Sequence, residues 1–263
     1  FLFTQQSFSQ GDYRFVNYSI SNGLSQSSVT TIIEDELNTL WVGTQDGLNR
    51  FDGGSFEVYN PENTKGLESG YILCSHKDKE GNLWFGTSKG LLMYSVFFDK
   101  FQTYKKEGGA IQIKDITEDK EGYLWVVTAE RGLFRFDKKQ KEFKSFYFLV
   151  PSVHTTKIEF FRKNNIIVST EDKGVFLCDI EKNTTRKTSD SKQKTKVNVI
   201  KKINKKGVFL GTNKGLFFLD KETNEIKNVF LKKETNEKVK NIKDVSFKEG
   251  VGWFLCTESE GLL

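Results

Sequence analysis

A run of four or five apolar residues recurs six times along the chain, each followed by a threonine, a short polar turn and a glycine. The six threonines are Thr44, Thr87, Thr128, Thr170, Thr212 and Thr257, which are 43, 41, 42, 42 and 45 residues apart. A repeat of about 42 residues is typical of a propeller blade of four strands. Each apolar run reads as a strand that is buried on both faces, which fits the second strand of a blade packed between its neighbours.

Two positions in the repeat predict how blades pack and turn. The position three before the threonine is large and should fill the space between neighbouring blades; it is occupied by Trp41, Trp84, Trp125, Ile167, Phe209 and Phe254. The glycine three or four residues after the threonine should supply a positive φ in the turn to the third strand. These glycines are Gly47, Gly90, Gly132, Gly174, Gly215 and Gly261.

The pattern predicts an all-β protein, a β-propeller of four-stranded antiparallel blades in a ring or partial ring. The propeller should cover residues 13–263, with blades at about 28–60, 70–105, 111–148, 156–188, 197–231 and 240–263. The last blade stops at the opening of its third strand, so we expect a longer polypeptide. Residues 13–20 alternate like an outer strand that closes the last blade. Residues 1–12 suit either the tail of a secretory signal peptide or a disordered leader.

Composition supports this architecture and narrows the partners. Aromatic residues make up 14% of the chain, there are 2 prolines, and no run of about 20 apolar residues suggests a membrane span. The net charge is +5, and residues 181–250 hold 19 Lys or Arg against 9 Asp or Glu. These lysines lie on expected outer strands and turns without interleaved aromatic residues, so we expect solvated edges and no nucleic-acid partner.

The sequence offers few groups for catalysis or metal binding. Three cysteines form no CxxC pair, and the two histidines, His76 and His154, lack nearby ligands at metal spacing. The acidic turns that begin at Asp35, Asp78 and Asp119 suit tight hairpins and lack calcium-loop spacing. We therefore expect no metal and no cofactor. Carboxylate pairs that meet across blades would leave no local signature, so a glycosidase-type pair stays open.

Polar residues between second and third strands should share one face around the central channel, where a hydroxyl-rich ligand could bind. The candidate ligand-binding residues are Gln45, Asp46, Ser88, Lys89, Glu130, Arg131, Asp172, Lys173, Asn213 and Lys214. Hairpin turns are also polar simply because they are wet, which is the alternative for each of these residues. No catalytic residue is assigned.

The repeated LW-V/F-GT-x-x-GL pattern, with the run Asn22 to Val29 ahead of the first blade, resembles the two-component regulator propeller repeat. The likeness covers about residues 14–263 and is closest in the first three blades. It implies the N-terminal part of the periplasmic sensor region of a Bacteroidetes hybrid histidine kinase. Propellers of this family are commonly seven-bladed, work as dimers and precede a membrane helix and a kinase core. None of the kinase motifs is present in this chain.

Three functions follow from these observations. The first is a non-catalytic, periplasmic sensor region that responds to a glycan fragment or another polar cue, as a homodimer attached to the membrane through the downstream part. The second is a scaffold for protein interactions. The third is a secreted propeller lyase or glycosidase, which would need carboxylates that converge on the channel.

Overall fold

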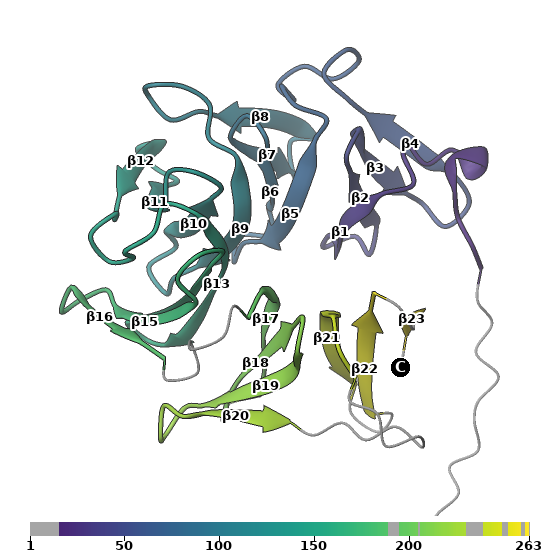
Figure 1. Ribbon diagram of the computed structural model, residues 1–263. Helices are drawn as coiled ribbons and strands as arrows, with labels where there is room; N and C mark the ends of the chain where they lie inside the picture. Colours follow the sequence, from purple (N-terminus) through teal and green to yellow (C-terminus); the bar gives the residue numbers. More distant parts are fainter. Residues whose placement is uncertain are drawn as a thin grey trace, which may run out of the picture.

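A computed structural model describes residues 16–188, 195–204, 206–229, 239–248, 252–258 and 261–262. Six antiparallel sheets surround a common centre like the blades of a pinwheel (Figure 1). Five sheets have four strands each, and three strands are described in the sixth. The predicted fold class, an all-β propeller of four-stranded antiparallel blades, is confirmed.

Every blade runs in the same order, from the centre outwards, because each strand pairs with the one before it. The inner strands are β1 (Val29–Glu34), β5 (Ile72–Lys77), β9 (Ile113–Glu118), β13 (Thr155–Arg162), β17 (Val197–Asn204) and β21 (Ile242–Lys248). The second strands are β2 (Leu40–Thr44), β6 (Leu83–Thr87), β10 (Leu124–Thr128), β14 (Asn165–Thr170), β18 (Gly207–Thr212) and β22 (Gly252–Thr257).

The third and fourth strands complete the blades. The third strands are β3 (Gly47–Phe51), β7 (Leu91–Ser95), β11 (Leu133–Asp137), β15 (Val175–Asp179), β19 (Gly215–Asp220) and β23 (Gly261–Leu262). The outer strands are β4 (Phe56–Tyr59), β8 (Lys100–Tyr104), β12 (Glu142–Ser145), β16 (Thr184–Lys187) and β20 (Ile226–Val229). We number the blades 1 to 6 in chain order.

The segment before blade 1 differs from the expected closing strand over 13–20. Residues 1–15 lie outside the described part of the chain, residues 16–19 form no strand, and Ile20–Asn22 is a short 3-10 helix, η1. The Tyr18 ring packs edge-on against Phe51 and Phe56 of blade 1, 5.0 and 5.6 Å between centroids. The described part of this segment therefore packs on the outer strands of blade 1 and is not an outer strand of blade 6.

The loop after η1 covers blade 1 on its free side. Leu24 is buried, and the Ser25 amide donates to the Asn49 side chain at 2.8 Å. The Asn49 side chain in turn donates to the Val42 carbonyl, so both the oxygen and the nitrogen of this buried amide on β3 have hydrogen-bond partners. Nearer the centre this side of blade 1 is open: Ile32 is 62% exposed, whereas the matching Ile116, Ile158, Ile200 and Val245 are at most 6% exposed.

Each tryptophan of the repeat fills the space between its own blade and the next. Trp41, Trp84 and Trp125 are all buried on second strands. Trp41 lies 4.4 Å from the Tyr94 ring of blade 2, and Trp84 lies 5.7 Å from the Phe136 ring of blade 3. Since a blade cannot cover its own two faces, these aromatic contacts hold successive sheets together.

The same tryptophans also bind the turn between the first two strands of their own blade. The indole Nε1 of Trp41, Trp84 and Trp125 donates to the buried carboxylate six residues earlier, at 2.9, 2.7 and 2.8 Å. These acceptors are Asp35, Asp78 and Asp119. Each carboxylate also accepts a backbone N–H of its turn, so an indole and a turn share one acceptor. Blade 4 has Phe161 and Ile167 at the two positions and lacks the bond.

An ion cluster ties the turns of blades 2 and 3 together. Lys138 of blade 3 reaches the carboxylates of Asp78 at 3.2 Å, Glu118 at 2.8 Å, and Glu80. Burial raises the pKa of Asp78, but the hydrogen bonds from Trp84 and Asn82 and the charge of Lys138 outweigh it, and the pKa is lowered. Asp78 thus stays ionised and available to its indole partner.

The threonine that marks the repeat closes the next turn. In all six blades its Oγ1 donates to the carbonyl of the following turn glycine, at 2.8 to 3.2 Å. These glycines have positive φ, including +144° at Gly90, where a Cβ would lie 2.4 Å from the Tyr104 carbonyl oxygen. The turn therefore needs glycine for its backbone angle and, at Gly90, for space.

The Asp–Trp bond gives a test of blade stability. We expect Asp119→Ala to lower the free energy of unfolding by about 2 to 3 kcal/mol, because the Trp125 N–H is left buried without an acceptor. Asp137→Ala is the matched control, since Asp137 also accepts two backbone N–H groups of a turn but no indole. It should cost about 1 kcal/mol or less. Urea unfolding followed by tryptophan fluorescence measures both; equal losses would contradict a special role for the indole bond.

Candidate functional site

The loops between second and third strands meet the loops that lead into the inner strands at one end of the ring, which we call the channel face. Backbone bonds join the two sets of loops: Ser88 N donates to Tyr71 O, Glu171 N to His154 O, and Asn213 N to Lys196 O. The sequence placed its ten candidate residues in these loops, and the structure brings them to this face, spread around the ring.

Part of the candidate set is exposed and part is not. Ser88, Asn213 and Lys214 are half-buried. The exposed candidates are Gln45, Asp46, Lys89, Glu130, Arg131, Asp172 and Lys173.

Several of the ten side chains hold the channel-face loops in place. Ser88 bonds to the Ser69 hydroxyl at 2.8 Å, and Arg131 donates to the Gly108 carbonyl at 3.2 Å. Lys173 donates to the Pro151 backbone carbonyl, and the side-chain Oδ1 of Asn213 accepts from the Lys196 backbone amide at 2.9 Å. These residues have a structural use that does not depend on a ligand.

Four of the candidate side chains make no polar contact with the described part of the protein. Within the described ranges, the side chains of Gln45, Asp46, Lys89 and Glu130 are placed in no hydrogen bond or ion pair, and all four are exposed. They come from the first three blades and present one amide, two carboxylates and one ammonium group. These groups can donate and accept hydrogen bonds to a polar ligand without first breaking a protein contact.

Blade 4 brings a serine, a histidine and a carboxylate close together on the channel face. The Ser152 hydroxyl donates to Asp172 at 2.5 Å, and this bond lowers the pKa of the Asp172 carboxyl. Ser152 also accepts the His154 amide, while His154 Nδ1 lies 3.0 Å from the Ala129 carbonyl. The hydroxyl is therefore bonded to the carboxylate and not to the imidazole, so the three groups do not form the serine–histidine pair of nucleophilic catalysis.

The inner strands carry a cluster of ionisable groups that sequence reasoning missed. Asp115 on β9 accepts the Ile158 amide at 3.0 Å and lies 3.9 Å from Lys157 Nζ, both on β13. Glu159 on β13 accepts the Phe160 amide at 2.8 Å and the Thr117 hydroxyl at 3.4 Å. The spacing of the repeat could have revealed this cluster. Asp115 and Lys157 each stand 13 residues before a repeat threonine, and Thr117 and Glu159 each stand 11 residues before one.

Burial is the main cause of the pKa shifts of Glu159, Asp115 and His76 on these inner strands. It raises the pKa of Glu159 to about 7 and raises that of Asp115 against the attraction of Lys157. The charge of Asp115 raises the pKa of Lys157. Burial lowers the pKa of His76, whose Nε2 is enclosed and has no hydrogen-bond partner within the part of the chain that is described. Glu159 thus changes charge near neutral pH.

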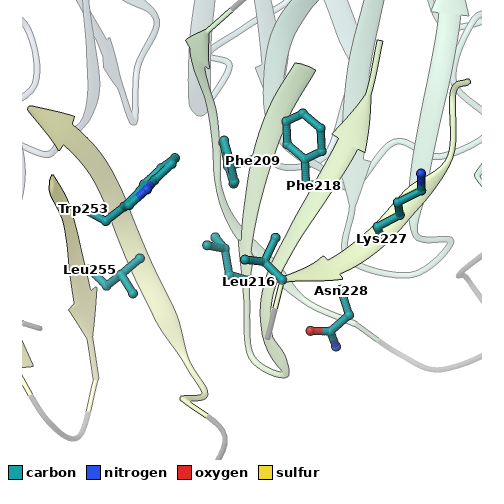
Figure 2. Close-up of a pocket in the computed structure, with 8 residues that line it drawn as sticks. Phe209, Leu216, Phe218, Lys227, Asn228, Trp253 and Leu255 are labelled. Atoms are coloured by element: carbon teal, nitrogen blue, oxygen red, sulfur yellow. The ribbon is translucent and has the colours of Figure 1, made fainter. Parts of the chain in front are cut away.

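The hollows in the surface lie between blades. An open cleft of about 430 Å³ lies between blades 5 and 6. In Figure 2, Trp253 and Leu255 on one side of it face Phe209 and Leu216 on the other. Phe209 stands at the tryptophan position, 4.6 Å from the Trp253 ring. The cleft is largely apolar, with Lys227 and Asn228 as its charged and amide groups, and does not match the polar chemistry of the channel face.

Metal chemistry finds little support in the described residues. They contain no group of three or more His, Cys, Asp or Glu side chains placed to hold a metal ion.

No helix among the described residues has the length and apolarity needed to cross a membrane.

The structure is therefore a β-propeller with polar loops on its channel face and a cluster of ionisable side chains on its inner strands. Residues 23–46 and 66–89 match the family model of the two component regulator propeller. The matched segments hold the first two strands of blades 1 and 2, so these blades carry two-component regulator propeller repeats. The resemblance in the sequence is thereby confirmed.

A known relative and a solved structure point the same way. A segment of 48 residues, 18% of this chain, is 50% identical to a histidine kinase of Formosa agariphila, of which it covers 4%. The extracellular domain of a putative hybrid two component system from B. thetaiotaomicron superposes with a TM-score of 0.79 at 20% identity. That superposition covers 94% of this chain and 34% of the other, so the chain spans about a third of that domain.

The propeller fold is shared beyond signalling proteins. Virginiamycin B lyase from Staphylococcus aureus superposes with a TM-score of 0.71 at 11% identity, over 89% of this chain and 80% of the lyase. At such low identity the likeness concerns the fold alone. The family model that residues 23–46 and 66–89 match is that of the two component regulator propeller, and the 48-residue segment is similar to a histidine kinase.

Glu159 should make stability depend on pH. Its pKa rises from 4.5 to about 7 on folding, so its contribution is fully present below pH 4.5 and is lost as pH rises through about 7. The native protein should lose up to about 3 kcal/mol from this group between pH 5 and 8. Glu159→Gln should remove that loss. Unfolding free energies of both proteins at pH 5 and 8 measure it; an identical pH dependence would contradict the assignment.

Proposed function

We propose that the chain is part of the ligand-sensing region of a two-component histidine kinase, outside the cytoplasmic membrane, and that it binds a small polar molecule at its channel face. The match of blades 1 and 2 to the two-component regulator propeller carries this proposal. Its likeness to an extracellular domain of a hybrid two component system supports the location, which we place in the periplasm.

The ligand class follows from the free groups at the channel face. The amide of Gln45, the carboxylates of Asp46 and Glu130 and the ammonium group of Lys89 suit a molecule with many hydroxyl groups, such as an oligosaccharide. Such a ligand would span neighbouring blades, because these residues come from three of them. Binding would signal only if it favoured one of two arrangements of blades or subunits, and we propose a homodimer in the parent receptor.

In this proposal the chain itself has no catalytic role. The arrangement of Ser152, His154 and Asp172 favours a structural use of the hydroxyl, and the repeat match is to signalling proteins. A scaffold for protein interactions is the competing function, and binding of small ligands separates the two.

Titration calorimetry against a panel of neutral and acidic oligosaccharides tests the proposal. We expect at least one member to bind, with a dissociation constant in the micromolar to millimolar range. Gln45→Ala and Glu130→Ala should each weaken that binding by about tenfold, since each loses hydrogen bonds to the ligand. Lys139→Ala is the control, because Lys139 is exposed in a β11–β12 turn at the other end of the ring. A protein that ignores every sugar would support the scaffold function instead.

A further inference from the structure

Two arginines converge on one turn at the rim between blades 4 and 5. Arg162, at the end of β13, donates through Nη2 to the Asn224 side chain at 3.0 Å and to the Lys221 carbonyl. Arg186, on the outer strand β16, donates through Nη2 to the Asn224 carbonyl at 3.2 Å. Both guanidinium groups are therefore held beside the same residue, although they come from different strands of blade 4.

This pair of positive charges is not fully balanced by carboxylates. Among the described residues, neither arginine has an Asp or Glu oxygen within ion-pair distance. Asp179 lies beside the arginines, and one of its oxygens accepts the amides of Glu181 and Lys182 at 3.1 and 2.9 Å, so a single carboxylate faces two guanidinium groups. Two like charges held together repel each other unless an anion lies between or beside them.

The space beside the arginines can hold such an anion. A mainly polar groove of about 320 Å³ is lined by both arginines, by Asp179, and by Asn165, Thr184, Thr185 and Asn224, with Phe161 and Leu177 as its apolar residues. A guanidinium group carries five N–H donors in a planar fork, and Nη2 is the donor that each arginine uses in the contacts above. The remaining donors, the amides and the hydroxyl groups give the groove more donors than acceptors.

We propose that this groove is a binding site for an oxyanion, namely a carboxylate, sulfate or phosphate group carried by a small polar ligand. Arginine forks match the paired oxygens of these groups and form strong charge-assisted bonds with them. The asparagine and threonine side chains would hold neighbouring hydroxyl groups. The site lies on the outer rim, away from the channel face, and does not depend on a signalling role.

A comparison of the blades explains why the site lies between blades 4 and 5. In blades 1 to 3 the position of Phe161 is an aspartate bonded to the repeat tryptophan, which adds a buried negative charge to that turn. In blade 4 both residues are replaced, by Phe161 and Ile167, and the next residue is Arg162. The first blade of the chain without the Asp–Trp pair thus has an arginine beside the position of the aspartate.

Titration at low ionic strength, followed by the NMR signals of the arginine side chains, tests the proposal. The probes are inorganic sulfate, inorganic phosphate and glucuronate, with glucose as the neutral control. We expect the Nε–H signals of Arg162 and Arg186 to shift and saturate at millimolar probe. Glucose should leave them unchanged. Preference for glucuronate over both inorganic ions would identify the source of the anion as an acidic sugar.

Substitutions separate the site from general positive charge. Arg186→Met should weaken anion binding about tenfold. Arg162→Lys, which keeps the charge but loses the fork and is less disruptive than Arg162→Met, should weaken it severalfold. Lys182→Met is the matched control, because it removes one exposed charge near the groove without lining it. Affinity unchanged in both arginine variants, or an equal loss in Lys182→Met, would overturn the proposal. Thermal unfolding of each variant confirms that it is folded.

Discussion

The structure depends on contact between the apolar faces of successive sheets. A four-stranded blade has two apolar faces and can cover neither alone, so the second strands are buried mainly by the neighbouring blades. Trp41 and Trp84 each supply such a contact against an aromatic ring of the following blade. Where the covering sheet is missing, as beside Ile32, the same kind of residue is exposed to water.

The repeat made the fold predictable because its signals are local. An apolar run, a threonine and a glycine within eight residues identify two strands and the turn between them, and the glycines do adopt positive φ. The threonine hydroxyl adds a reason for its recurrence, since it closes the turn in every blade. Such features need no knowledge of distant residues.

Features that depend on how side chains meet in space were harder to predict. The bond from Trp84 to Asp78 spans six residues, yet the aspartate read only as a turn former until the indole was placed beside it. The cluster of Asp115, Lys157 and Glu159 requires two inner strands in register, which no single repeat encodes. The segment 13–20 alternates like a strand, but its described residues pack Tyr18 on blade 1 instead. The channel-face residues could be placed by sequence, but not sorted into loop anchors and free groups.

The division of the channel face into anchors and free groups affects how the molecule could respond to a ligand. Contacts such as Ser88 with Ser69 and Arg131 with Gly108 fix the loops before anything binds, so the free side chains are presented from a rigid frame. A rigid frame loses little entropy on binding. A response to a ligand would then pass through the contacts between blades more readily than through the loops themselves.

The loss of the Asp–Trp bond after blade 3 has a consequence for the cooperativity of the whole ring. In a repeat protein each unit is stabilised by its own fold and by its nearest neighbours, so strength can vary along the chain. Blades 1 to 3 carry the bonds between indole and turn, and blades 2 and 3 share the ion cluster around Lys138, whereas blade 4 has no bond between an indole and its turn. Hydrogen exchange and local opening should therefore concentrate in the second half of the chain, and the first three blades would act as the stable core on which the rest of the ring is held.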